Sequence, residues 1–109
     1  MAVKDQTLYL NHIRECIERI ERYAGLGHED FLKNTMVQDA IYRNLEIIGE
    51  AARNLNENTR AKMPDVPWKK VIGLRNVLIH AYDGVDPLEV WLVIEKELPK
   101  LKSEIQTHL

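Results

Sequence analysis

Residues 35–55 read TMVQDAIYRNLEIIGEAARNL, and this stretch decides the fold because its apolar side chains cover about half of a helical wheel. One apolar stripe, with the three- and four-residue spacing of a helix face, consists of Val37, Ile41, Leu45, Ile48, Ala52 and Leu55. A second stripe, rotated to the side, consists of Met36, Ala40, Ile47 and Ala51. So wide an apolar surface needs several neighbours, which predicts the central helix of a bundle.

The other side of this helix is charged. It carries Arg43, Glu46, Glu50 and Arg53, whose three- and four-residue spacings permit ion pairs within the helix. Two interpretations stay open for this side. Either the whole face is charged and solvated, or Glu46 or Glu50 contributes to a functional cleft.

Three more segments show helical patterns. Residues 5–24 have the apolar face Tyr9, Leu10, Ile13, Cys16, Ile17, Ile20 and Tyr23. A third helix is predicted over 67–82, and a fourth begins at 87 and turns inward Val90, Trp91, Ile94, Leu98, Leu101 and Ile105. With no strand alternation, the predicted class is all-α: an antiparallel up-and-down four-helix bundle that forms one domain over residues 1–109.

Several residues predict where these helices begin and bend. Thr35 and Gln38 have the spacing of a capping box, which predicts that the central helix starts there. Asp86 and Pro87 suit the cap and first turn of the fourth helix. Pro99 lies inside that helix and is expected to kink it, because proline lacks a backbone donor and crowds the preceding turn.

Composition excludes several classes of protein. The 109 residues include 15 basic and 17 acidic side chains, and a net charge of −2 gives no global field to attract nucleic acid. The single cysteine, Cys16, lies on an apolar stripe and is expected to be a buried small hydrophobe. With neither a signal peptide nor an apolar run of membrane-spanning length, a cytoplasmic location is expected. No glycine-rich phosphate loop is present, so no cofactor is predicted.

The segment RNVLIHAY, residues 75–82, places polar side chains beside apolar ones on the third helix. The wheel directs Val71, Leu74, Val77, Leu78 and Ala81 to the core. Arg75 and His80 border an outward sector with Asn76, Ile72 and Ile79. Two outward isoleucines need a cover, which predicts a homodimer through this helix, with each Arg75–His80 pair facing its twin across a cleft.

These residue types suit phosphate chemistry. A guanidinium holds two phosphate oxygens at once, and an imidazole moves protons near neutral pH without a metal ion. With an RNA substrate, the 2′-hydroxyl would be the nucleophile and a cyclic phosphate the product. The spacing is also compatible with a structural role, in which Arg75 pairs with an acid and His80 lies at a helix C-terminus.

Three segments, RNLEIIGEAARNL (43–55), PWKKVIGLRNVLIHAYDGVD (67–86) and VWLVIEKELPKL (90–101), resemble the HepT family of HEPN-domain toxins. The family pattern is Arg, a polar residue, three to five further residues, His, any residue and Tyr. Arg75, Asn76, His80 and Tyr82 match it. The resemblance implies a dimeric HEPN bundle in which Arg75 and His80 cleave RNA without metal and Asn76 supports them.

The resemblance also implies a partner, the minimal nucleotidyltransferase antitoxin MntA, which transfers AMP from ATP to the motif tyrosine, here Tyr82. Adenylate at Tyr82 would add bulk and negative charge beside the cleft and thereby neutralise the toxin. The expected function is the ribonuclease toxin of a toxin–antitoxin pair. The alternative is a non-catalytic HEPN binding module that serves the nucleotidyltransferase as substrate and scaffold.

The remaining candidate residues are expected to be structural. His12, His28 and His108 lack the spacing of metal ligands and are expected on the surface. Trp68 and Trp91 begin the third and fourth helices and are expected to anchor the core.

Overall fold

A computed structural model describes residues 2–80 and 84–109, and within these ranges all side chains except those at positions 2–5, 77, 79 and 80. The elements are α1 (Ala2–Tyr23), η1 (Ala24–Leu26), α2 (His28–Lys33), α3 (Thr35–Asn54), α4 (Glu57–Ala61), α5 (Trp68–His80), α6 (Pro87–Leu92), the π-helical η3 (Val93–Glu97) and α7 (Leu98–Thr107). Every regular element in the described residues is helical, which confirms the all-α class. None of these helices combines the length and apolar content that a bilayer span requires.

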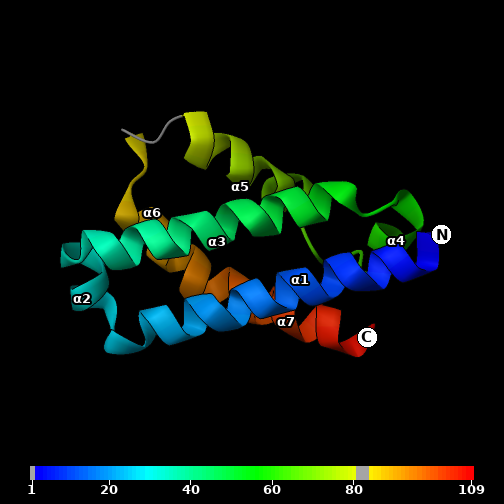
Figure 1. Ribbon diagram of the computed structural model, residues 1–109, viewed down its shortest axis with the longest axis horizontal. Coiled ribbons are helices and arrows are strands. Elements are labelled where there is room, and N and C mark those ends of the chain that lie inside the picture. The colour runs from blue at the N-terminus through cyan, green and yellow to red at the C-terminus, as the bar shows by residue number, and fades with distance from the viewer. Residues whose placement is uncertain (1, 81–83) are drawn as a thin grey trace.

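Helix α3 is the centre of the bundle, as its two apolar stripes predict. It packs against α1 on one side and α5 on the other, while α7 lies against α1 (Figure 1). Successive long helices run in opposite directions, from α1 through α3 and α5 to α7 (Figure 1). The predicted up-and-down arrangement is confirmed, with α6, η3 and α7 together in the place of the fourth helix.

The buried core joins α1, α3, α5 and α7. Its side chains are Leu10, Ile13, Cys16, Ile17, Ile20, Phe31, Ile41, Leu45, Ile48, Ala51, Ala52, Leu55, Met63, Val66, Val71, Leu78, Val90, Ile94, Leu98, Leu101 and Ile105. The second stripe of α3 is buried only in part, since Ile47 is half-buried and Met36 is exposed at its N-terminal end. Cys16 is buried as predicted, and burial raises the pKa of its thiol.

The start of α3 differs from the predicted capping box. The cap is Asn34, whose backbone is extended and whose Oδ1 accepts a hydrogen bond of 3.2 Å from the Val37 N–H. Gln38 instead donates through Nε2 to the Phe31 carbonyl at 2.8 Å. The predicted start of the helix at Thr35 is confirmed, but the capping residue was wrong by one, because asparagine caps at least as well as threonine and Gln38 bonds across the turn from α2.

The cap and first-turn proline predicted for the C-terminal helical unit are present. Asp86 Oδ1 accepts from the Leu88 N–H at 2.9 Å, and Pro87 occupies the first turn of α6. Pro99 lies in the first turn of α7, and α7 directly follows the five π-helical residues Val93–Glu97. The irregularity expected from Pro99 is therefore the π-helical turn before it, where the hydrogen-bond ladder changes register.

Both tryptophans pack against the core, as predicted. The Trp68 Nε1–H donates to the carbonyls of Arg60 and Met63, each at 3.2 Å. These bonds join the first residue of α5 to the connector that contains α4. They fix where α5 begins and so help set the position of Arg75, two turns further along.

Candidate functional site

Arg75 lies on α5 where this helix crosses the polar side of α3. Its side chain is 33% exposed, and its Nε lies 2.6 Å from Glu50 Oε2 on α3. Its Nη1 donates a long hydrogen bond of 3.5 Å to Oδ1 of the exposed neighbour Asn76. The structure thus brings together two of the predicted site residues and adds the carboxylate of Glu50, for which the sequence left open either a solvated face or a functional cleft.

The Glu50–Arg75 ion pair bears on both interpretations of Arg75. It is the kind of acidic partner expected for a structural arginine. It engages one edge of the guanidinium only, however, and leaves the side chain partly open to solvent. An arginine held this way can still bind an anion through its remaining N–H donors.

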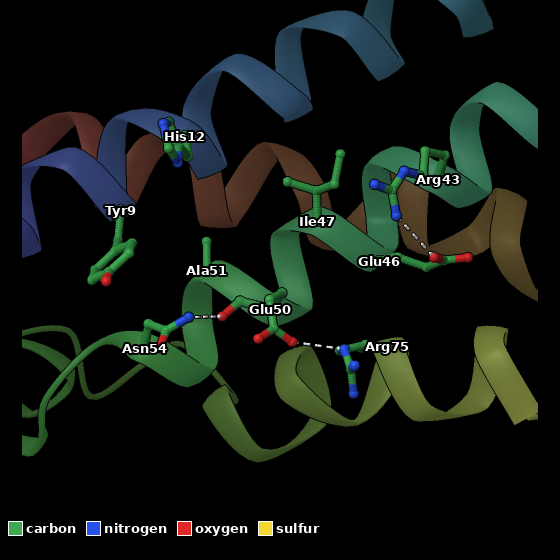
Figure 2. A pocket seen from close by; sticks show the side chains of 9 residues that line it. All are labelled: Tyr9, His12, Arg43, Glu46, Ile47, Glu50, Ala51, Asn54 and Arg75. Carbon is green, nitrogen blue, oxygen red and sulfur yellow. Dashed lines mark hydrogen bonds and ion pairs between the residues drawn. The ribbon is translucent and has the colours of Figure 1, made fainter.

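Arg75 and Glu50 lie in a cleft of about 340 Å³ that crosses three helices (Figure 2). The cleft is lined by Tyr9, His12, Arg43, Glu46, Ile47, Glu50, Ala51, Asn54 and Arg75. Figure 2 shows the α1 residues Tyr9 and His12 on one wall and Arg75 on the other, with the α3 side chains between them. Because α1 supplies one wall, the cleft depends on the packing of three helices and not on α5 alone.

His12 and Tyr9 are the cleft residues that sequence reasoning did not select. His12 is exposed, as predicted, but it lies in the same cleft as Arg75. Tyr9 was assigned to the apolar face of α1, and it is half-buried against the core while also lining the cleft. Their spacing of three residues could have marked them as neighbours on one face, but nothing local indicates that this face meets α5.

The structure describes only part of the other two motif residues, His80 and Tyr82. The α5 backbone is helical through His80, which is its last described residue, and the imidazole lies outside the described side chains. Tyr82 lies outside the described residues. The convergence of Arg75 with His80, and the place of Tyr82 beside them, therefore remain predictions.

The wheel prediction for α5 is partly confirmed. Val71 and Leu78 are buried, and Leu74 is half-buried. Ile72, expected on the outward sector, is half-buried against the core of its own chain, because α5 is more deeply embedded than the wheel assumed. Ile72 therefore supplies less uncovered apolar surface than the dimer argument required, and the homodimer stays a prediction.

A second hollow, of about 880 Å³, lies between the start of α5 and the η3–α7 unit. It is lined mainly by apolar and aliphatic side chains, among them Val66, Val71, Leu74, Val93 and Leu98. Neither Arg75 nor Asn76 lines it. Arg75 thus belongs to the smaller polar cleft, and Asn76 lines neither hollow.

Tyr42 has a raised pKa. Burial raises the pKa of its hydroxyl, and the nearby carboxylates of Asp39 and Asp86 raise it further. The Tyr42 oxygen is itself buried, and its ring packs edge-on against Phe31. A shielded phenol in an aromatic cluster is poorly placed to meet another enzyme, so Tyr42 is a structural residue.

Comparison with known proteins identifies the family. Residues 13–108 match the family model described as "Ribonuclease HepT-like". A protein of Methanocaldococcus jannaschii named "Putative RNase" is 40% identical over 107 residues, which cover 97% of this chain and 98% of that protein. No solved structure matches the chain.

Two more relatives agree with this result. A Caldanaerobacter subterraneus protein, also named "Putative RNase", is 46% identical over 93% of this chain and 91% of its own length. A Thermococcus cleftensis protein named "Probable ribonuclease HepT" is 39% identical, with 90% of each chain covered. The family match covers nearly the whole bundle, including α3 and α5, which hold the candidate site. The chain belongs to the HepT-like ribonuclease family.

Proposed function

We propose that this chain is the toxin of a toxin–antitoxin pair and that it cleaves RNA without a metal ion. The observation that carries the proposal is the setting of Arg75, half-exposed in a polar cleft on a helix that continues to His80, in a member of the HepT-like ribonuclease family. Family membership supports the ribonuclease class. The residue roles rest on the match of Arg75, Asn76, His80 and Tyr82 to the family motif.

In the proposed reaction Arg75 binds the non-bridging oxygens of the scissile phosphate. His80 takes the proton from the ribose 2′-hydroxyl or gives one to the leaving 5′-oxygen. The 2′-oxygen forms a bond to phosphorus as the bond to the 5′-oxygen breaks. The products are a 2′,3′-cyclic phosphate and a free 5′-hydroxyl. Asn76 supports Arg75, whose Nη1 already donates to the Asn76 amide oxygen.

A homodimer would supply two copies of this pair to one groove. One copy could then act as base while the other protonates the leaving group, which would divide the two proton transfers between separate imidazoles. Gathering two Arg75–His80 pairs in one groove would help RNA binding, because a chain with a net charge of −2 does not attract RNA as a whole. The expected location of this activity is the cytoplasm.

The ribonuclease proposal is tested with purified protein and RNA in the presence of EDTA. Wild type is expected to cleave, and His80→Ala is expected to lose nearly all activity, because general acid–base catalysis contributes about 10²- to 10⁴-fold. Exposed His108 provides the matched control, and His108→Ala should cleave like wild type. Equal cleavage by wild type and His80→Ala would show that the activity comes from a contaminant or from other residues.

Control by a partner is the second part of the proposal. An MntA-like nucleotidyltransferase would transfer AMP from ATP to the Tyr82 hydroxyl, whose oxygen attacks the α-phosphorus and displaces pyrophosphate. The resulting phosphodiester adds a negative charge near Arg75 and His80, which would repel the phosphates of RNA. Neutralisation then needs no unfolding of the toxin.

Mass spectrometry after incubation with the nucleotidyltransferase encoded beside this chain and ATP tests the acceptor. Wild type should gain the mass of AMP, and Tyr82→Phe should not. Tyr9→Phe, at the half-buried tyrosine of the cleft, should still gain it. An unchanged mass shift in Tyr82→Phe would remove Tyr82 as the acceptor.

The alternative function is a non-catalytic HEPN module that serves a nucleotidyltransferase as substrate and scaffold. It is favoured by the charge of the cleft, since each of its arginines is paired with a glutamate: Arg43 with Glu46 and Arg75 with Glu50. Such a module would take AMP at Tyr82 yet show no cleavage that depends on His80. The two assays together separate the alternatives.

A further inference from the structure

Glu50 makes the closest polar contact to Arg75 among the described residues. Its Oε2 lies 2.6 Å from Nε as an ion pair, and that buried oxygen has no hydrogen-bond partner among the described residues, although the side chain as a whole is 47% exposed. The contact joins α3 to α5, so it depends on how the two helices pack and not on local spacing.

The edge of the guanidinium that faces Glu50 determines which N–H donors of Arg75 remain free to bind a substrate. Arginine has five N–H donors, one on Nε and two on each terminal nitrogen. Figure 2 shows the Nε edge turned toward Glu50. Asn76 accepts from Nη1 only weakly, at 3.5 Å. The two terminal nitrogens thus keep donors with which to grip two oxygens of a phosphate end-on.

Gly49, the residue before Glu50, sets the distance between the two helices. A Cβ at Gly49 would lie 2.9 Å from Arg75 Cβ, 3.1 Å from Arg75 N and 3.2 Å from the Val71 carbonyl oxygen. The first distance is shorter than real Cβ contacts and the other two are tight, so a larger residue at position 49 would have to push α3 and α5 apart at Arg75. Gly49 fixes the position of the Arg75 backbone, and Glu50 restricts the guanidinium beyond it.

We propose that Glu50 is a positioning residue for Arg75, holding the guanidinium by Nε so that its terminal nitrogens are oriented for the scissile phosphate before RNA arrives. This inference rests on the proposed ribonuclease function. A free arginine side chain loses rotamer entropy when it is fixed. The ion pair imposes part of that restriction during folding, so less is lost when the phosphate binds and the transition state forms.

Glu46 provides a matched control on the same helix. It lies one turn before Glu50, lines the same cleft, and pairs at 3.5 Å with Arg43, which is outside the motif. Removing either carboxylate changes the net charge equally and leaves the buried core intact. Only the removal of Glu50 frees Arg75.

The test compares steady-state RNA cleavage by wild type, Glu50→Ala, Glu50→Gln and Glu46→Ala. Glu50→Ala is expected to lower kcat by about 10- to 100-fold, the loss typical of a misplaced catalytic group, with a smaller change in KM. Glu46→Ala should stay within about twofold of wild type, since a surface charge far from the phosphate contributes little. Glu50→Gln keeps the length of the side chain but removes the charge of the ion pair, so it should also lower kcat.

An Arg75→Lys background shows whether Glu50 acts through Arg75. Lysine has no Nε–H edge of this kind, so adding Glu50→Ala there should cost less than about threefold, far less than in wild type. In spectra of 15N-arginine-labelled protein without RNA, the Arg75 Nε resonance should have the same chemical shift in wild type and Glu46→Ala and a different one in Glu50→Ala, because only the last variant loses the charge beside Nε. A merely structural Glu50 would lower thermal stability without this pattern.

The outcomes are distinguishable. If wild type cleaves RNA and Glu50→Ala matches Glu46→Ala, or if Glu50→Ala costs as much in Arg75→Lys as in wild type, the positioning role is wrong while the ribonuclease proposal stands. If wild type shows no cleavage that depends on His80, the proposed function fails and the positioning role fails with it, whatever the Nε–H resonance shows.

Discussion

Helix α3 carries two glutamate–arginine pairs one turn apart, and they differ in what they connect. Glu46 pairs with Arg43 on the same helix at 3.5 Å, and the arginine side chain is 71% exposed. Glu50 pairs with Arg75 on α5 at 2.6 Å, beside a close approach of the two helices at Gly49. The first pair lies on the surface of one helix, whereas the second joins two helices at the motif arginine.

The difference also shows what the sequence could predict. The Arg43–Glu46 pair follows from a spacing of three residues, which is a local property of any helix. The Glu50–Arg75 pair depends on the packing of α3 against α5, which no local spacing encodes. The same spacing rule would have paired Glu50 with Arg53, yet the carboxylate meets Arg75.

The largest expected effect concerns the helix approach beneath the second pair. Gly49→Ala should lower the free energy of unfolding by about 1–3 kcal/mol, because overpacking against Arg75 and Val71 outweighs the better helix propensity of alanine. Urea denaturation followed by circular dichroism measures this. Ribonuclease activity should fall as well, because Arg75 would be displaced.

Gly73 on α5 is the control for that prediction. A Cβ at Gly73 would meet nothing within 4 Å, so Gly73→Ala should stabilise the protein by about 0.5–1 kcal/mol through helix propensity alone. If both substitutions changed stability in the same direction, the close approach at Gly49 would not be the determining contact.

A smaller effect separates the two ion pairs directly. A double-mutant cycle on stability with Glu50→Ala and Arg75→Ala should give a coupling of about 0.5–1 kcal/mol, since both side chains remain partly exposed. The same cycle with Glu46→Ala and Arg43→Ala should give about 0.3 kcal/mol or less. Equal couplings would mean that an ion pair between two helices contributes no more to stability than one within a helix.

The smallest effect is expected at Asn44, a buried polar residue on the same helix. Its Nδ2 donates to the Ala40 carbonyl at 2.9 Å within α3, and its Oδ1 is buried without a hydrogen-bond partner among the described residues. Asn44→Leu should therefore change stability by no more than about 0.5 kcal/mol. A loss above about 2 kcal/mol in thermal or urea unfolding would reveal a partner for that oxygen and make Asn44 a second anchor like Glu50.

Helix existence and order were predictable because apolar periodicity on α1, α3 and α7 is strong and the caps are local. The start of α3 at Thr35 was predictable too, but its capping residue was not, since Asn34 and Thr35 are both competent caps and Gln38 bonds to the Phe31 carbonyl. For the site, Arg75 and Asn76 were selected by residue type and by resemblance. His12, Tyr9 and the specific role of Glu50 were not, because the wall that α1 contributes exists only after folding.

The central claim, that Arg75 and His80 direct the RNA's own 2′-hydroxyl at the neighbouring phosphate, is tested most directly on an oligonucleotide with one mapped cleavage site. Mass spectrometry of the products from wild type, with EDTA present, should show a 2′,3′-cyclic phosphate and a 5′-hydroxyl. A single 2′-deoxy substitution at that site should abolish cleavage there. Cleavage of the deoxy substrate at the same bond, or products that end in a 3′-hydroxyl, would contradict the account.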